Sequence, residues 1–321
     1  MMKKNMWSRW ILALAVVWPC MAAAHDRVRE KENFDFDWKF ILNADDRANA
    51  GMQVSETGWQ DVQLPHDWSI SLNFDPKLSG SNGHLPGGIG WYRKMFRVDK
   101  KDKGRRIAVL FDGIYSRSDV YVNGQHLGFR PYGFCYQEYD LTPYLNYGAE
   151  NVLAVRVNNP LEHDSVARWY TGAGIYRHAW LVKTAEVHVA SYGTYVTTPV
   201  VTAERAEVRV RTSVANEAER TKTLSVRQQI TDGEGRTVVQ SGKQALQVAA
   251  GQTADTEHTL EIPRPQLWDT EHPYLYTLHT TIYDGRKLVD TYETVFGVRT
   301  CEFTPDCGFL LNGKPLKLKG F

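Results

Sequence analysis

The sequence predicts an all-β chain built from two sandwiches, and three observations support that prediction. Short apolar or alternating runs, separated by turn residues, follow one another from about residue 34 to 298. Asn-Gly stands between apolar runs at 123–124 and 312–313, which is the strongest short-range signal of a β-hairpin. No long stretch has helical periodicity. The chain has 321 residues, which is room for roughly two domains.

The first half consists of short β runs. Residues 106–111 are an apolar run typical of a buried strand, and Asp112-Gly113 ends it. Residues 119–128 contain the first Asn-Gly hairpin, and 151–157 and 179–182 continue the pattern.

The second half has a different texture. Apolar and polar residues alternate strictly at 186–189, 206–214 and 224–230, and turns at 232–235 and 284–285 separate these runs. The pattern predicts a sandwich of about immunoglobulin size without the paired cysteines of antibody domains.

The end of the chain has its own pattern. After Asn312-Gly313, Leu316 and Leu318 alternate with Lys317 and Lys319, as in a strand with one buried face. An apolar strand without a partner is an aggregation liability, so we expect a further domain after residue 321.

Residues 1–24 have the pattern of an export signal. Basic residues precede an apolar run at 11–18 that is too short to span a bilayer, and Ala22-Ala23-Ala24 is a cleavage site. The mature chain is therefore expected to begin at His25 and to be periplasmic or extracellular. Cys20 could indicate a lipid anchor, although the bulky Val17-Trp18-Pro19 before it is unlike a lipobox.

Charge and cysteine content exclude several classes. Lys and Arg total 38 against 37 Asp and Glu, so there is no electrostatic case for nucleic acid or an anionic membrane surface. The mature chain has three cysteines, Cys135, Cys301 and Cys307, so at least one is unpaired and no disulfide framework is expected. Ten Trp and 16 Tyr suit sugar-ring faces, but large sandwich cores use aromatics as well.

Four segments are distinctive in their order and spacing. They are Leu64-Pro65-His66-Asp67-Trp68-Ser69-Ile70, Gly87-Gly88-Ile89-Gly90-Trp91-Tyr92-Arg93-Lys94, Arg168-Trp169-Tyr170-Thr171-Gly172-Ala173-Gly174-Ile175-Tyr176-Arg177 and Lys317-Leu318-Lys319-Gly320-Phe321. From about residue 34 to the end, the chain closely resembles glycoside hydrolase family 2, the β-galactosidase/β-glucuronidase family.

That resemblance implies an architecture. The family has a jelly-roll sugar-binding domain, an immunoglobulin-like sandwich and then a (β/α)8 TIM barrel. Here it implies a signal peptide at 1–24, a jelly roll at 25–185, an immunoglobulin-like sandwich at 186–298 and the start of a barrel at 299–321, with the rest of the barrel missing.

The resemblance also implies a function. The full-length enzyme would be a retaining glycosidase of β-linked glycans, and the wording of the motifs is most similar to the β-galactosidase branch. Galactose, glucuronic acid and mannose remain open as the sugar, and so does the oligomeric state of the full-length enzyme. A stand-alone carbohydrate-binding protein and a structural or adhesive β-sandwich protein are the alternatives.

No catalytic residue is expected in this chain. A retaining glycosidase needs two facing carboxylates, and in the family both are barrel glutamates, the acid/base following an asparagine. Asn216-Glu217 is the only such pair here, and we interpret it as part of a solvated turn of the second sandwich. No glycosidase activity is therefore expected of this chain alone.

The predicted substrate-binding residues are Arg168, Trp169, Tyr170 and His178. An arginine fork offers donors to sugar hydroxyls, and two aromatic rings offer a stacking surface. The alternative is that Arg168 and Tyr170 only brace a domain interface. In some family members the residue at position 178 is acidic and helps to bind a monovalent ion, but imidazole is a poor ligand for such an ion, so neither a metal nor a cofactor is expected.

Two further motifs allow more than one interpretation. His66 beside Asp67 could be a catalytic or metal pair, but one His and one carboxylate are too few ligands for a metal, so we favour a role in locking a turn. Trp91, after a glycine-rich entrance, could fill the core or contact a ligand.

Overall fold

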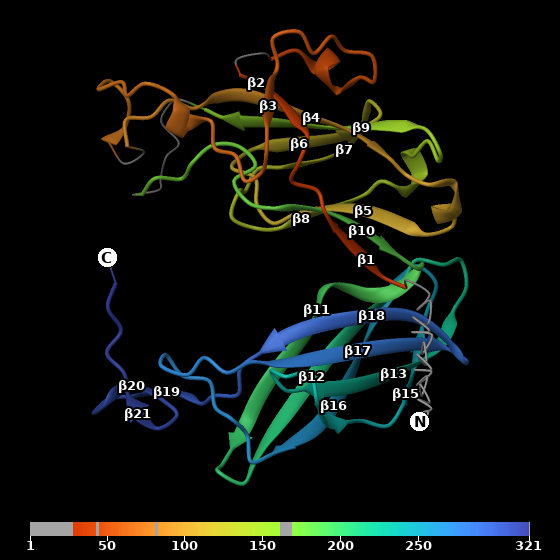
Figure 1. The fold of residues 1–321 in the computed structure, drawn as a ribbon, viewed down its shortest axis with the longest axis vertical. Helices are drawn as coiled ribbons and strands as arrows, with labels where there is room; N and C mark the ends of the chain where they lie inside the picture. Colours follow the sequence, from red (N-terminus) through yellow and green to blue (C-terminus); the bar gives the residue numbers. More distant parts are fainter. Residues whose placement is uncertain (1–27, 43–44, 81–82, 161–168, 321) are drawn as a thin grey trace, which may run out of the picture.

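The computed structural model describes residues 28–42, 45–80, 83–160 and 169–320. Within these ranges the chain forms antiparallel sheets joined by turns and short 3-10 helices, which confirms the predicted all-β class. Two sandwiches follow one another along the long axis, and a small sheet lies near the C-terminal end (Figure 1). The predicted export signal at 1–24 lies outside the described residues.

The first sandwich packs a six-stranded sheet against a four-stranded one. The six-stranded sheet has the order β3 (Gln60–Val62), β2 (Trp38–Leu42), β4 (Gly88–Arg97), β9 (Glu150–Asn159), β6 (Ser118–Val122) and β7 (Gln125–Arg130). The four-stranded sheet has the order β1 (Glu30–Asn33), β10 (Ala179–Thr184), β5 (Arg106–Phe111) and β8 (Gln137–Asp140). Short 3-10 helices lie at Arg47–Ala50, Ser69–Ser71, Lys100–Asp102 and Thr142–Tyr144.

Aromatic side chains dominate the core of this sandwich. Trp68 stacks on Phe40 with ring centroids 5.5 Å apart, and Gly90 lies so close that a Cβ there would come within 2.7 Å of Phe40 and 2.9 Å of Trp68. Glycine at this position therefore lets β4 approach the core. Trp91 is fully buried and belongs to a smaller apolar cluster with Tyr121, so it fills the core.

The second sandwich packs a three-stranded sheet against a five-stranded one. The first has the order β11 (Val187–Val201), β12 (Arg205–Asn216) and β16 (Gln252–Pro263). The second has the order β14 (Thr237–Gln240), β13 (Lys222–Thr231), β17 (Tyr276–Asp284) and β18 (Lys287–Phe296), with β15 (Gln244–Val248) also paired to β13. The predicted alternation is confirmed in β12, where Ala206, Val208 and Val210 are buried in turn.

The C-terminal sheet has three strands and is anchored to the second sandwich. It comprises β19 (Cys301–Thr304), β20 (Gly308–Leu311) and β21 (Lys314–Pro315). Asn312, in its predicted Asn-Gly turn, donates from Nδ2 to the Trp268 carbonyl at 3.0 Å and accepts from the Thr300 amide at 3.0 Å. The prediction of a strand through Leu316 and Leu318 is wrong, because β21 ends at Pro315. The Leu316 amide still donates to the Phe309 carbonyl of β20. Antiparallel pairing cannot continue much further, because β20 begins at Gly308.

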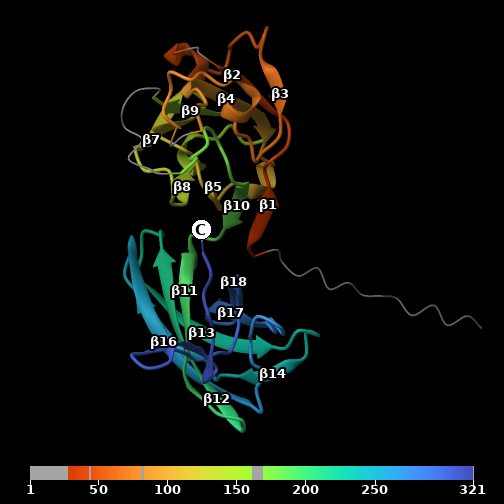
Figure 2. The same ribbon diagram turned by 90° about the vertical axis from the view of Figure 1, so that its left-hand side faces the viewer.

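Ion pairs join the two sandwiches, which meet where β1 and β10 approach β11 (Figure 2). Arg29 donates to both carboxylate oxygens of Asp290, at 3.0 and 2.8 Å, and to the Val189 carbonyl at 2.6 Å. Asp290 is fully buried and also accepts from the Val189 amide. Arg106 of β5 donates to Glu217, just after β12, at 2.9 Å.

Candidate functional site

Asp67 organises the loop that presents Tyr170. Its Oδ2 accepts from the Tyr170 hydroxyl at 2.5 Å, and its Oδ1 accepts from the amides of Ser69 and Ala173, both at 3.0 Å. These contacts tie the loop after β3 to the segment before β10. Burial, followed by the bond to the Asp67 carboxylate, raises the pKa of Tyr170, so its hydroxyl stays protonated and donates.

The His66 side chain contacts Tyr92 and Phe40 and forms no catalytic or metal-binding pair with Asp67. Its Nδ1 lies 2.8 Å from the Tyr92 hydroxyl, its ring packs against Phe40 at 4.8 Å between centroids, and burial lowers its pKa. Both residues lie in a loop after β3, where their contacts are those of turn-locking residues. Within the described residues no group of three or more His, Cys, Asp or Glu side chains converges on a potential metal position.

Trp169 belongs to an exposed aromatic cluster centred on Phe134. The centroid of the Phe134 ring lies 5.1 Å from Tyr115, 5.7 Å from Tyr132, 6.3 Å from Trp169 and 6.5 Å from Tyr176. Trp169 is 58% exposed and Tyr132 is 62% exposed. We call these five residues the aromatic cluster.

The position of the cluster follows from two loops that pack together. The Tyr176 hydroxyl donates to the Gly133 carbonyl at 3.0 Å, which holds the loop between β7 and β8 against the segment before β10. Sequence reasoning missed Tyr132 and Phe134, although the run Pro131-Tyr132-Gly133-Phe134 places two aromatics in a turn between strands. Flat exposed rings at this density are suited to the apolar faces of sugar rings.

The other predicted site residues are not all brought together. His178 Nδ1 lies 2.7 Å from Oδ2 of the buried Asp35, whose Oδ1 accepts from the Ala179 amide at 2.8 Å. No contact in the described part of the chain links His178 to Trp169 or Tyr170, so its place is that of a residue bracing the start of β10. Arg168 lies outside the described residues.

The solvated turn predicted at Asn216-Glu217 is wrong for Asn216 and confirmed for Glu217, which is exposed directly after β12. Asn216 is fully buried, and its Nδ2 donates to the carbonyls of Arg220, Val248 and Ala249. Glu217 is part of the contact between sandwiches through Arg106. An amide side chain with several donor and acceptor sites can close a turn in this way, which composition alone does not reveal.

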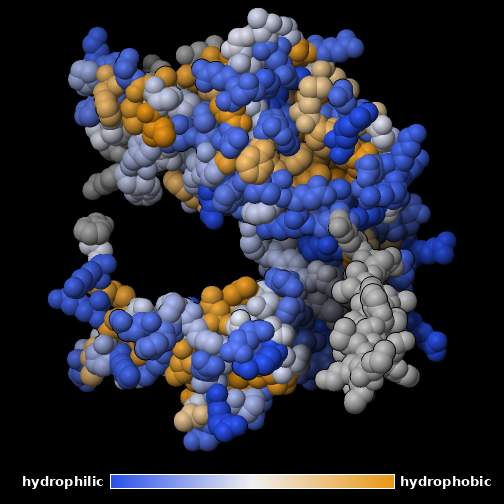
Figure 3. All heavy atoms as spheres, in the orientation of Figure 1, coloured by the Kyte–Doolittle hydropathy of each residue, from blue (hydrophilic) through white to orange (hydrophobic). Residues whose placement is uncertain are grey.

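Figure 3 shows a deep hollow between the first sandwich and the C-terminal sheet.

Among the described residues, no helix is long and apolar enough to cross a bilayer. Cys135, Cys301 and Cys307 are free and exposed.

Two family models match the chain. The model described as "Glycosyl hydrolases family 2, sugar binding domain" matches residues 32–185, and "Glycosyl hydrolases family 2" matches residues 187–299. The chain belongs to glycosyl hydrolase family 2. The two antiparallel sandwiches agree with the jelly-roll and immunoglobulin-like folds that the motifs predicted.

Relatives in this family are similar over nearly the whole chain. A beta-galactosidase of Bacteroides ovatus is 41% identical over 309 residues, covering 94% of this chain and 35% of that protein. A beta-glucuronidase of Formosa agariphila is 34% identical, covering 91% of this chain and 32% of that protein. The chain therefore spans about a third of the length of these relatives.

A solved structure shows the same fold. A glycosyl hydrolase family 2 member from Bacteroides cellulosilyticus superposes with a TM-score of 0.81 at 39% identity, covering 90% of this chain and 39% of that one. The aromatic cluster accordingly lies on the part of the chain that matches the sugar-binding domain.

Proposed function

We propose that this chain is the non-catalytic, sugar-contacting part of an exported family 2 glycosidase of β-galactosidase type. Its parts would be a leader at 1–24, a jelly roll at 25–185, an immunoglobulin-like sandwich at 186–298 and a connection at 299–321 to a barrel. The hydrolysis of β-linked glycans would then depend on two glutamates of that barrel. The 41% identity to a beta-galactosidase over 309 residues supports this assignment.

The observation that carries the proposal is the aromatic cluster with Tyr170 beside it. Trp169 offers a flat exposed ring, and the Tyr170 hydroxyl is held by Asp67 at the same end of the sandwich. These groups form one wall of a sugar site, with Arg168 of the same segment as a further donor. A single open wall leaves most of a sugar in water, so the barrel would supply the remaining contacts and the enclosure.

The test is sugar binding by the purified chain. Titration with galactose should show no saturation below millimolar concentrations, and Trp169→Ala should remove what saturation there is. Tyr144→Ala is the matched control, because Tyr144 is also an exposed aromatic of the first sandwich, 43% exposed, and lies outside the cluster. Micromolar affinity lost on Trp169→Ala would instead support a stand-alone binding protein, and binding indifferent to Trp169 would remove the cluster from the sugar site.

A further inference from the structure

A cavity of about 520 Å³ lies between the two sandwiches, and none of the five residues of the aromatic cluster is among those that line it. The first sandwich contributes Arg106, Tyr136 and Glu138 to its wall, and the second contributes His188, Ser191 and Glu217. Tyr136 is close to Phe134 in sequence, but its ring packs on Tyr192 at 4.7 Å between centroids. A cavity of this size is in the range that holds a small organic ligand.

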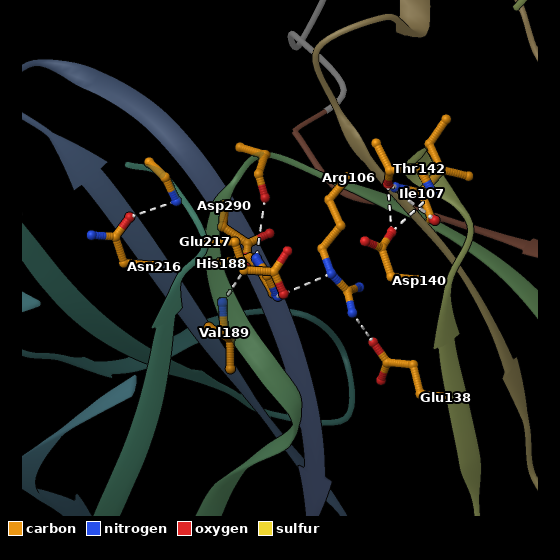
Figure 4. Close-up of polar contacts among 12 residues, drawn as sticks. Arg106, Ile107, Glu138, Asp140, Thr142, His188, Val189, Asn216, Glu217 and Asp290 are labelled. Atoms are coloured by element: carbon orange, nitrogen blue, oxygen red, sulfur yellow. Dashed lines mark hydrogen bonds and ion pairs between the residues drawn. The ribbon is translucent and has the colours of Figure 1, made fainter. Parts of the chain in front are cut away.

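Charged groups of the wall hold one another in place. Arg106 donates from Nη2 to Glu138 at 2.6 Å and from Nε to Glu217 at 2.9 Å, so one guanidinium bridges the two sandwiches (Figure 4). The side chains of Arg106 and Glu138 are only 12% and 16% exposed. These charge-assisted bonds fix the position of both carboxylates.

His188 brings an unused acceptor to this wall. Its Nδ1 faces the Ala185 carbonyl at 3.1 Å and must donate to it, so Nε2 of the neutral ring carries a lone pair. His188 is only 4% exposed. Its burial, together with the positive charges of Arg106 and Arg29, lowers the pKa of the imidazole to about 4. The ring is therefore neutral at physiological pH.

A second acceptor, Glu217 Oε1, lies beside His188 Nε2 and already accepts from Arg106 Nε at 2.9 Å. The distance between His188 Nε2 and Glu217 Oε1 is 4.0 Å, and no group in the described ranges donates a hydrogen bond to Nε2. Because His188 lines the cavity, its Nε2 is open to a donor there. A hydroxyl group of a molecule in the cavity would supply that donor.

We propose that this cavity binds a neutral saccharide unit, one of whose hydroxyl groups donates to His188 Nε2. A sugar hydroxyl donates and accepts at once, so neighbouring hydroxyls can also serve Glu217, Glu138 and Arg106. The exposed face of Tyr136, which is 47% exposed, suits the sugar ring. This site lies beyond the proposed function, whose sugar contacts are at the aromatic cluster.

The charge of the wall selects the ligand class. Arg106 and Arg130 are matched by Glu138 and Glu217, so the lining has no excess of either sign. Phosphate or a uronic acid would have to displace a carboxylate from Arg106, and a cation would meet the guanidinium groups. A neutral polyhydroxylated molecule meets neither obstacle.

The experiment follows backbone amide shifts of the whole chain by NMR during titration with methyl β-galactoside, methyl β-glucoside and methyl β-mannoside. At least one should give saturable shifts at Glu138, Ser191 and Glu217. Tyr136→Ala and His188→Phe should each weaken this binding about tenfold or more. Tyr195→Ala, at a 61% exposed tyrosine of the second sandwich outside the cavity, is the matched control and should leave it unchanged.

Further outcomes separate the two sites. Trp169→Ala should leave the shifts at Ser191 and Glu217 intact, whatever it does to binding at the aromatic cluster. If His188→Phe fails to fold, Tyr136→Ala carries the test, since its side chain is half exposed. The proposal is overturned if all three glycosides leave these amides unshifted up to about 100 mM, if only phosphate or galacturonate shifts them, or if the shifts persist in both variants.

Discussion

At the scale of single residues, the contacts of Asp67 predict how much its substitution lowers the free energy of unfolding. One carboxylate accepts from two backbone amides and from the Tyr170 hydroxyl, so Asp67→Ala leaves three donors without their acceptor. We expect a loss of about 2 kcal/mol in the free energy of unfolding, measured with urea. Tyr170→Phe removes only one of these bonds and should cost about 1 kcal/mol or less. Equal losses for both variants would contradict the role given to the two amides.

His188 predicts how stability depends on pH. Burial lowers the pKa of its imidazole from 6.5 to about 4, so between these values the unfolded chain binds a proton that the folded chain excludes. The contribution of His188 to the free energy of unfolding is therefore complete above pH 6.5 and is lost as the pH falls toward 4. The total loss is about 3 kcal/mol.

His188→Gln should therefore flatten the dependence of urea-unfolding free energy on pH between 6.5 and 4. His272→Gln is the matched control, because the His272 side chain is 83% exposed. An unchanged slope in His188→Gln would show that the imidazole is not held neutral by the fold.

At the scale of elements, local signals predicted strands well and tertiary contacts poorly. The run at 106–111 and both Asn-Gly hairpins are present, because each depends on neighbours in sequence. Tyr132 and Phe134 were missed because the loop that carries them meets Trp169 only after folding. The contact between His178 and Asp35 could not be predicted for the same reason, since the two residues are 143 apart in sequence.

The contact between β1 and the second sandwich depends on Arg29. Because Asp290 is fully buried, Arg29→Ala should leave an unpaired carboxylate and cost about 3–5 kcal/mol in unfolding free energy. The double variant Arg29→Met with Asp290→Asn removes both charges and should be more stable than Arg29→Ala alone. Chemical denaturation followed by fluorescence and circular dichroism measures both, and additive losses would rule out the pair as a coupled unit.

At the scale of the whole molecule, Arg29–Asp290 and Arg106–Glu217 join the two sandwiches, and a deep hollow separates the first sandwich from the C-terminal sheet (Figure 3). The order of four motifs was sufficient to predict the family and the succession of the sandwiches. The positions of side chains at the junction could not be predicted, because Arg29 and Asp290 are 261 residues apart in sequence. Asn216 was misjudged for a related reason, since polar turn residues can be buried when their amides are satisfied.

The central claim is that this chain contacts sugar without performing hydrolysis, and the most direct measurement is the turnover of nitrophenyl β-galactoside and β-glucuronide by the purified chain. The predicted result is hydrolysis no faster than in buffer, because a retaining glycosidase needs two carboxylates roughly 5 Å apart in one site. Glu217, the one glutamate that follows an asparagine, is bound to Arg106 instead. Turnover that survives repurification and disappears on substituting a single Asp or Glu of this chain would contradict the account.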